Sequence, residues 1–278
     1  ITNKEGGILD DVLAYRFDDH YLLVVNASNR EKIVAWIAQH QGSFNATVTD
    51  VTLQQSMLAI QGPCSVKILN VLAKIDVGEL KYYHGIETQI LGADAVVSRT
   101  GYTGEDGFEV IVPAERAEDI WTALMADGEA DGIRPAGLGC RDTLRLEAAM
   151  PLYGHEMDES TDPWTAGLGF GVRLKAGKFI GKDALISLKQ NTDLPKRTGI
   201  ILDIKRIARE GSLLFYQNNE VGRVTSGTFS PTLGKSIAMG YLPVNLAQPG
   251  TSLEIEIRGK RVAGIVTALP FYKREDKS

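Results

Sequence analysis

Cysteine and histidine are scarce in this sequence, and their placement argues against a metal centre. The two cysteines, Cys64 and Cys140, lie far apart and outside any metal-binding spacing. The four histidines form no HxH or HxxxH pair; they are His20, His40, His84 and His155. The two cysteines can pair, but so few thiols in 278 residues suit a reducing compartment. We therefore expect no metal cofactor and a cytoplasmic location.

Long apolar runs and an excess of basic residues are also missing. No segment approaches the roughly 20 apolar residues that a membrane-spanning helix needs, and no secretory signal sequence is recognisable. The formal net charge is -5 at pH 7. A mildly acidic chain has neither the electrostatic footprint of a nucleic-acid-binding protein nor a polybasic membrane patch. We expect neither nucleic acid nor a membrane among its partners.

The composition is otherwise ordinary, and the chain is long enough for more than one domain. Hydrophobic residues make up 44% of it and charged residues 23%, so a sizeable core can form. The polar segment 191–196 has the composition of a linker. Six short strands separated by Gly, Pro and Asn turns follow it and predict a small antiparallel barrel or sandwich; they cover residues 198–203, 212–216, 222–228, 235–241, 252–257 and 262–269. We place a domain boundary near residue 195.

The most unusual stretch is RTGYTGEDGFE at residues 99–109, which lies between two valine-rich runs that predict strands. Three glycines within seven positions predict a tight loop, because glycine takes φ > 0 without a steric cost. Around Tyr102 the loop carries an unusual charge load. Alternation places Glu109 on the sheet face opposite to Phe108 and Val110. A solvated turn is the ordinary interpretation, but a carboxylate on an inward face needs a partner or a ligand.

An acidic pair lies in the first of two predicted strands. Residues 8–15 and 21–26 are largely apolar and predict a β-hairpin. Asp10 and Asp11 are unexpected inside a strand, where aspartate is disfavoured. Because adjacent strand residues face opposite ways, one carboxylate should meet solvent and the other the opposite side. The pattern fits two solvated acids on an edge strand as well as it fits a functional acid.

The rest of the chain before the linker predicts a mixture of helices and strands. Helical spacing or capping signals predict helices at residues 31–40, 65–72, 115–125, 143–149 and 183–189. Apolar alternation or short apolar runs predict strands at residues 46–52, 56–61, 86–91, 93–98, 110–112 and 167–172.

A glycine-rich turn, RPAGLGCRD at residues 134–142, precedes the predicted helix at 143–149. Such a turn can present backbone N–H groups to an anion. Arg141 lies at or near the first helical turn, where its charge opposes the helix dipole. A cation there usually has an acidic partner or an anionic ligand. An internal ion pair with Asp142 or Glu147 and a bound anion both remain open.

Four motifs together closely resemble the T-protein of the glycine cleavage system, the aminomethyltransferase. They are GGILDD at 6–11, RTGYTGEDGFE at 99–109, RPAGLGCRDTLRLE at 134–147 and TSGTFSPTLGK at 225–235, and they follow the family's order along the whole chain. The family's N-terminal segment has no counterpart and the chain begins without methionine, so we expect a truncated or processed copy. The resemblance implies an α+β, multi-lobed folate-binding fold, with two interleaved lobes in residues 1–195 and a C-terminal antiparallel β-barrel in residues 196–278.

The resemblance also implies a reaction and its partners. An aminomethyl group on the lipoyl arm of H-protein passes to the co-substrate tetrahydrofolate; ammonia leaves and 5,10-methylenetetrahydrofolate forms. By similarity Asp11 is the catalytic acid beside folate N5, and Asp10 is its outward neighbour. A carboxylate there orients the folate and stabilises developing positive charge. The same similarity assigns folate contacts to Tyr15, Asn26, Tyr102, Glu109, Arg141 and Trp164.

Two other classes share the implied fold. Folate-binding domains of dimethylglycine and sarcosine oxidising enzymes, like sulfonium demethylases, use other methyl or methylene donors, but the T-protein motifs here are complete. Non-catalytic folate-binding proteins related to tRNA modification carry a cysteine before the loop tyrosine, where this chain has Gly101. We rank both behind the transferase. The expected location is the bacterial cytoplasm, or the mitochondrial matrix for a eukaryotic source.

Overall fold

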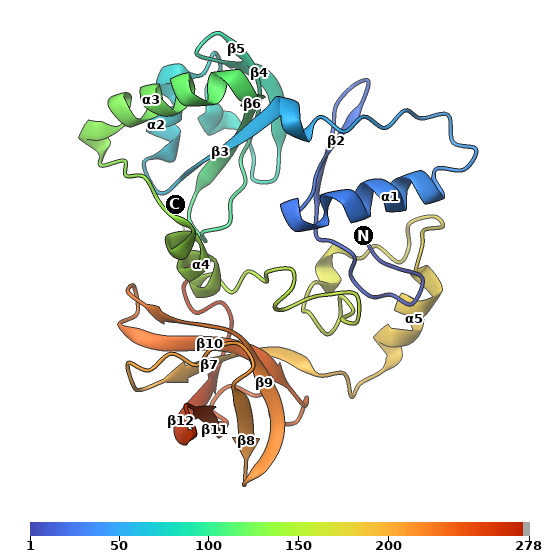
Figure 1. The fold of residues 1–278 in the computed structure, drawn as a ribbon, viewed down its shortest axis with the longest axis vertical. Coiled ribbons are helices and arrows are strands. Elements are labelled where there is room, and N and C mark those ends of the chain that lie inside the picture. Colours follow the sequence, from blue (N-terminus) through green and yellow to red (C-terminus); the bar gives the residue numbers. More distant parts are fainter. Residues whose placement is uncertain (275–278) are drawn as a thin grey trace. The chain divides into compact units, whose positions relative to one another are not determined.

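The computed structural model describes residues 1–274 and divides into two units that exchange segments along the chain. One unit contains residues 1–12 and 25–33 and everything described from Asp142 onward. The other contains residues 13–24 and 34–141. We call them the barrel unit and the sheet unit, after the strands that each contains. Figure 1 labels their helices and strands.

The sheet unit is built on a four-stranded antiparallel sheet with the strand order β3-β6-β5-β4. The strands are β3 (Gln55–Gln61), β4 (Gly85–Ile90), β5 (Ala93–Ser98) and β6 (Gly107–Pro113). Helices α2 (Ser65–Leu72) and α3 (Ala117–Asp127) cover one face of this sheet (Figure 1). Their apolar residues, such as Leu69 and Ile120, pack against Phe108 and Val110 in a fully buried core. The helices and strands predicted between residues 55 and 127 are confirmed to within a few residues.

A hairpin of β1 (Leu13–Arg16) and β2 (Tyr21–Val24) packs on the other side of the same sheet. The Tyr15 ring lies against Gly85, where an added Cβ would sit 2.8 Å from Tyr15 Cδ1. The hairpin is confirmed, but Asp10 and Asp11 precede β1, so their predicted place inside the strand was wrong. The backbone N–H of Ile8 instead bonds to loop carbonyls at Asp158 and Thr161, 3.1 and 3.0 Å away.

Helix α1 (Arg30–His40) follows the hairpin and agrees with the predicted helix. The strand predicted at 46–52 is not formed; the backbone there is irregular and ends in a 3-10 turn at Thr52–Gln54. Its apolar residues, such as Val48 and Val51, are exposed. Valine-rich sequence alone does not make a strand where no neighbouring strand pairs with it.

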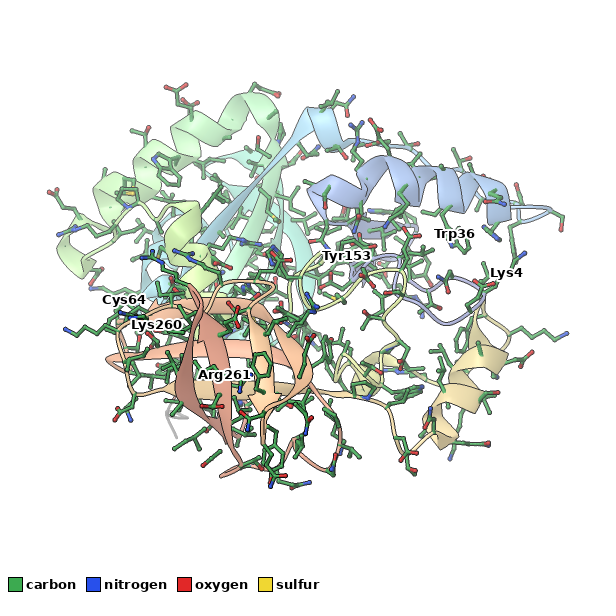
Figure 2. The ribbon with its side chains drawn as sticks, turned by 60° about the horizontal axis from the view of Figure 1, so that its bottom comes forward. Lys4, Trp36, Cys64, Tyr153, Lys260 and Arg261 are labelled. Carbon is green, nitrogen blue, oxygen red and sulfur yellow. The ribbon has the colours of Figure 1, made fainter. Side chains whose placement is uncertain are left out.

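The barrel unit contains a closed barrel of six antiparallel strands in the order β10-β7-β12-β11-β8-β9. They are β7 (Lys196–Leu202), β8 (Leu213–Tyr216), β9 (Asn219–Ser230), β10 (Lys235–Leu242), β11 (Ser252–Ile257) and β12 (Lys260–Thr267). Ile200, Leu214 and Ile255 are fully buried in its centre. On the outside, Arg261 lies over the ring of Phe215, 3.9 Å from its centroid (Figure 2). All six predicted strands are confirmed, in a barrel rather than a sandwich.

Two further helices, α4 (Leu138–Glu147) and α5 (Lys182–Gln190), lie in the chain between the strands of the sheet and those of the barrel. Helix α4 begins five residues before the predicted start at 143, and its Leu146 packs on β10 through Ile237 and Met239. Helix α5 agrees with prediction. The strand predicted at 167–172 is wrong, because residues 169–171 form a 3-10 turn. Within residues 1–274, no helix is both long and apolar enough to cross a membrane.

Candidate functional site

The acidic pair lies just before β1, and its two carboxyl groups have opposite surroundings. Asp10 is fully buried, whereas Asp11 is exposed. The prediction that Asp10 is the outward neighbour was therefore wrong. Donors from later in the chain explain this: Asn26 N lies 3.0 Å from Asp10 Oδ2, and the amides of Asn26 and Asn29 lie 2.7 and 2.5 Å from Asp10 Oδ1.

Asp11 has the surroundings of a group that exchanges protons near neutral pH. Protein atoms around it reduce its hydration although part of the side chain meets solvent, and this raises the pKa of Asp11 to about 6. The hydrogen bond from Asn26 Nδ2, at 2.7 Å, acts in the opposite direction, while the neighbouring charge of Asp10 raises the pKa further. Of the predicted site residues, the barrel unit thus brings Asp11 and Asn26 together.

The sheet unit holds Glu109 in a buried polar network. Glu109 lies on the sheet face opposite to Phe108 and Val110, as alternation predicts, and is paired in register with Ser98. Thr100 Oγ1 donates to Glu109 Oε2 at 2.7 Å, and Ser98 Oγ lies 3.1 Å from Thr100 Oγ1.

Tyr15 completes this network from the hairpin. Its hydroxyl donates to Ser98 Oγ at 3.0 Å, and burial raises the pKa of Tyr15. The predicted residues Tyr15 and Glu109 are therefore linked through two hydroxyl side chains. Sequence reasoning missed Ser98 and Thr100; the one available signal was a hydroxyl residue directly before the loop motif and another at its second position.

Gln61 at the end of β3 explains two of the three loop glycines. Its amide donates to the carbonyls of Thr100 and Phe108, both at 3.1 Å. An added Cβ would sit 1.9 Å from Gln61 Oε1 at Gly101 and 2.4 Å from it at Gly107. Only Gly104 of the three has positive φ, at 81°. The prediction that all three supply φ > 0 was wrong, because two of them make room for a side chain.

Two of the charged residues in the loop stabilise the loop itself. Arg99 and Asp106 form a two-point ion pair, with Nε–Oδ1 and Nη2–Oδ2 distances of 2.9 and 2.6 Å. Arg99 Nη1 also donates to the carbonyls of Gly78 and Leu80. The ion pair closes the loop, and the two bonds from Arg99 Nη1 hold the loop against the neighbouring turn.

Arg141 lies over the ring of Tyr102, with 4.8 Å from Cζ to the ring centroid. The two acids offered as its internal partners are engaged elsewhere. Asp142 pairs with Arg145 at 2.7 Å, and Glu147 accepts hydrogen bonds from Ser230 and Thr232 at 2.5 and 2.8 Å. Neither of the two ion pairs offered for Arg141 is therefore formed, and the bound anion stays a prediction.

Trp164 has a packing role that the sequence did not predict. Its indole N–H donates to the Leu185 carbonyl at 3.0 Å, and Lys189 lies over its ring at 5.4 Å. The ring also occupies the space that a Cβ at Gly169 would need. Its proposed contact with folate stays a prediction.

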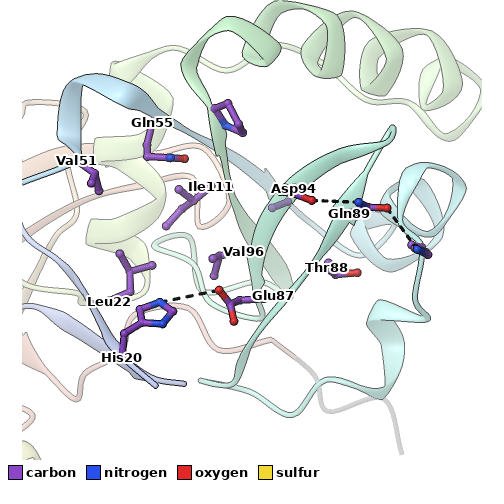
Figure 3. A pocket seen from close by; sticks show the side chains of 13 residues that line it. His20, Leu22, Val51, Gln55, Glu87, Thr88, Gln89, Asp94, Val96 and Ile111 are labelled. Atoms are coloured by element: carbon purple, nitrogen blue, oxygen red, sulfur yellow. Dashed lines mark hydrogen bonds and ion pairs between the residues drawn. The ribbon is translucent and has the colours of Figure 1, made fainter. Parts of the chain in front are cut away.

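An open depression of about 680 Å³ lies on the hairpin side of the sheet in the sheet unit (Figure 3). Its rim carries an exposed His20–Glu87 contact of 3.9 Å and a Gln89–Asp94 hydrogen bond of 3.0 Å. None of the predicted site residues lines it. Cys64 and Cys140 are both free and exposed (Figure 2 labels Cys64), and within residues 1–274 no three His, Cys, Asp or Glu side chains gather as metal ligands.

Comparison with known proteins covers nearly the whole chain. Residues 1–176 match the family described as the GCVT N-terminal domain, and residues 196–273 match the glycine cleavage T-protein C-terminal barrel domain. The chain is 44% identical over 278 residues to an aminomethyltransferase of Desulforamulus reducens. It is 45% identical over 277 residues to one of Saccharopolyspora erythraea. Each alignment covers 99% of this chain and 76% of the relative.

A solved structure agrees with these relatives. The glycine cleavage system aminomethyltransferase T from Bartonella henselae matches with a TM-score of 0.90 and 34% identity, over 98% of this chain and 74% of that one. Fold and relatives together define a folate-dependent transferase with a C-terminal barrel. The chain belongs to the aminomethyltransferase family, the T-proteins of the glycine cleavage system.

Proposed function

We propose that this chain transfers an aminomethyl group from the lipoyl arm of H-protein to tetrahydrofolate. Family membership over both matched ranges, at 44–45% identity to the two named relatives, is the observation that carries the proposal. The C–S and C–N bonds of the aminomethyl group break, and its carbon becomes bound to folate N5 and N10. The two displaced protons leave on the lipoyl thiol and on ammonia, so the products are dihydrolipoyl H-protein, ammonia and 5,10-methylenetetrahydrofolate.

Asp11 is the residue that we assign to the chemistry. Its exposed carboxyl group can reach a substrate, and its pKa of about 6 leaves both protonation states accessible near neutral pH. In its ionised form it stabilises positive charge that develops at folate N5 or at the methylene carbon. Asn26 holds this carboxyl group by the 2.7 Å hydrogen bond from Nδ2 and is proposed to contact the folate as well.

Glu109 suits the recognition of a reduced pterin. The sheet unit buries its carboxylate, and Thr100 donates to one oxygen at 2.7 Å. A carboxylate accepts at both oxygens, so it can also receive two N–H groups of the pterin ring. Tyr15 shares the network and is proposed to line the same folate site.

Three further residues are proposed to contact the folate. Arg141 presents a planar guanidinium held over Tyr102, which suits an oxygen or a carboxylate of the folate. Tyr102 is proposed to contact the folate beside it. Trp164 is proposed as part of the wall.

The test is an assay with three donors in parallel. The purified chain is mixed with tetrahydrofolate and with H-protein that carries a ¹³C-labelled aminomethyl group, or with sarcosine, or with a dimethylsulfonium compound. We expect labelled methylenetetrahydrofolate and equimolar ammonia from loaded H-protein alone. Methyl transfer from sarcosine or the sulfonium donor, which would give 5-methyltetrahydrofolate instead, would assign the chain to the demethylases. Absence of product from every donor would contradict the proposal.

A further inference from the structure

The two aspartates of the acidic pair share one hydrogen-bond donor. Asn26 Nδ2 lies 2.7 Å from Asp10 Oδ1 and 2.7 Å from Asp11 Oδ1. A primary amide carries two N–H donors, so one amide can serve both carboxyl groups at once. The side chain of Asn26 therefore couples a buried carboxylate to the exposed one that we assign to the chemistry.

Asp10 is held at both of its oxygens. Asn26 N lies 3.0 Å from Oδ2, and Asn29 Nδ2 lies 2.5 Å from Oδ1. Asn29 is itself 4% exposed and Asn26 is half-buried, so the Asp10 carboxyl group is removed from solvent. A buried carboxylate is costly unless its hydrogen bonds are complete. Here they are supplied by two asparagines, one of which also reaches Asp11.

We propose that Asp10 is a positioning residue that orients the Asp11 carboxyl group through Asn26 and whose negative charge favours protonated Asp11. This inference rests on the proposed function, because it concerns the acid that the reaction uses. Among residues 1–274, the charged groups that act on Asp11 include Asp10, which favours its protonated form, and the amino group of Ile1, which favours its ionised form. Asn26 also favours the ionised form, because it donates to it.

Asp10 and Asn26 shift the pKa of Asp11 in opposite directions, and this makes the proposal testable. Removing the charge of Asp10 lowers the pKa of Asp11, whereas removing the amide of Asn26 raises it. A merely structural role would give a different result, because loosening the turn would hydrate Asp11 and lower its pKa in both variants.

The experiment is a ¹³C NMR titration of the Asp11 carboxyl carbon, which is identified by its loss in Asp11→Asn. Relative to the unsubstituted chain, we expect the titration midpoint to fall by roughly half a pH unit or more in Asp10→Asn and to rise in Asn26→Ala. The acid limb of the pH–rate profile should move with it. In Asp10→Asn, kcat for transfer should fall about tenfold with little change in KM for tetrahydrofolate.

Two further variants complete the design. Asp10→Ser keeps an acceptor without a charge and serves if Asp10→Asn fails to fold, since an asparagine there would direct an N–H at Asn26 N. Asp76→Asn is the matched control, because Asp76 also accepts from an asparagine amide and a backbone N–H, at 2.9 and 2.8 Å. It should leave the Asp11 midpoint where it is.

The proposal is overturned if folded Asp10→Asn or Asp10→Ser leaves the midpoint unchanged, or if Asp10→Asn and Asn26→Ala move it in the same direction. The titration is read without substrate. A chain that shows both opposite shifts but forms no methylenetetrahydrofolate would therefore contradict the proposed function and not the coupling of the two carboxyl groups.

Discussion

Arg145 and Glu156 form an ion pair of 2.8 Å in the protein interior, with 2% and 0% of their side chains exposed. Arg145 Nη2 also donates to Ser226 at 2.8 Å, and Thr225 Oγ1 donates to Glu156 at 2.6 Å. The network joins α4, the loop after it and strand β9. Removing the charge of Glu156 leaves the buried guanidinium of Arg145 with Asp142, whose side chain is 53% exposed, as its acidic partner. Losing the buried partner of a buried charge costs several kcal/mol.

Glu156→Gln should therefore destabilise the barrel unit by about 3 kcal/mol in urea unfolding. The matched control is Glu220→Gln, which removes an exposed pair with Arg223 at 3.2 Å and should cost about 0.5 kcal/mol or less. Equal losses of unfolding free energy in the two variants would show that burial does not set the strength of the Arg145–Glu156 pair.

A second prediction concerns the close approach of Gln61 to the loop. Gly101→Ala should cost about 2 kcal/mol, because its Cβ would overlap Gln61 Oε1. In a Gln61→Ala background the same substitution should cost about 0.5 kcal/mol or less. Gly177→Ala, where nothing lies within 4 Å, is the control. If urea unfolding gave the same cost in both backgrounds, steric overlap with Gln61 would not be the reason for the glycine.

A third prediction concerns the hydroxyl that supports Glu109. Thr100→Val removes the 2.7 Å donor and leaves the buried carboxylate less well held. Calorimetric titration should then show tetrahydrofolate binding about five- to tenfold weaker, as expected for the loss of one hydrogen bond of about 1 kcal/mol. Thr100→Ser, which keeps the hydroxyl, should bind as the unsubstituted chain does. Equal affinity for all three would remove Thr100 from the folate site.

A fourth prediction follows from the raised pKa of Asp11. Because the folded state holds this proton up to about pH 6 and the unfolded state releases it near 3.8, ionised Asp11 lowers stability above pH 6. Asp11→Asn should raise the melting temperature at pH 7.5 and lose this advantage as the pH falls from about 6 to 4. The gain should be only about 1–2 °C, since Asp11 remains partly hydrated. A difference in melting temperature that stays constant from pH 4 to 8 would contradict the raised pKa.

Local patterns predicted most of the fold. The barrel strands and helices α1, α2 and α5 follow from alternation, helical spacing and turn residues within a few positions of each element. The failures at 46–52 and 167–172 have a common cause, because strand-like residues need a partner strand that the sequence does not locate. Gly169 instead lies against the ring of Trp164, which fills the space that a Cβ at residue 169 would need.

The sequence predicted individual site residues, but it did not predict the residues that surround them. The buried side of the acidic pair depends on Asn29, 19 residues after Asp10, and no local period reports such a contact. Gln61 is a second example: it lies at the end of β3 and occupies the space that a Cβ at Gly101 would need. Family resemblance selected Asp11 and Glu109; the structure adds Asn29, Ser98 and Thr100 as the residues that hold such groups in place.

The most direct test of the account is a single-turnover measurement of aminomethyl transfer from loaded H-protein by Asp11→Asn at saturating tetrahydrofolate. We predict a rate at least about 100-fold below that of the unsubstituted chain, with tetrahydrofolate affinity nearly unchanged. A rate equal to that of the unsubstituted chain would contradict the assignment of Asp11 to the chemistry.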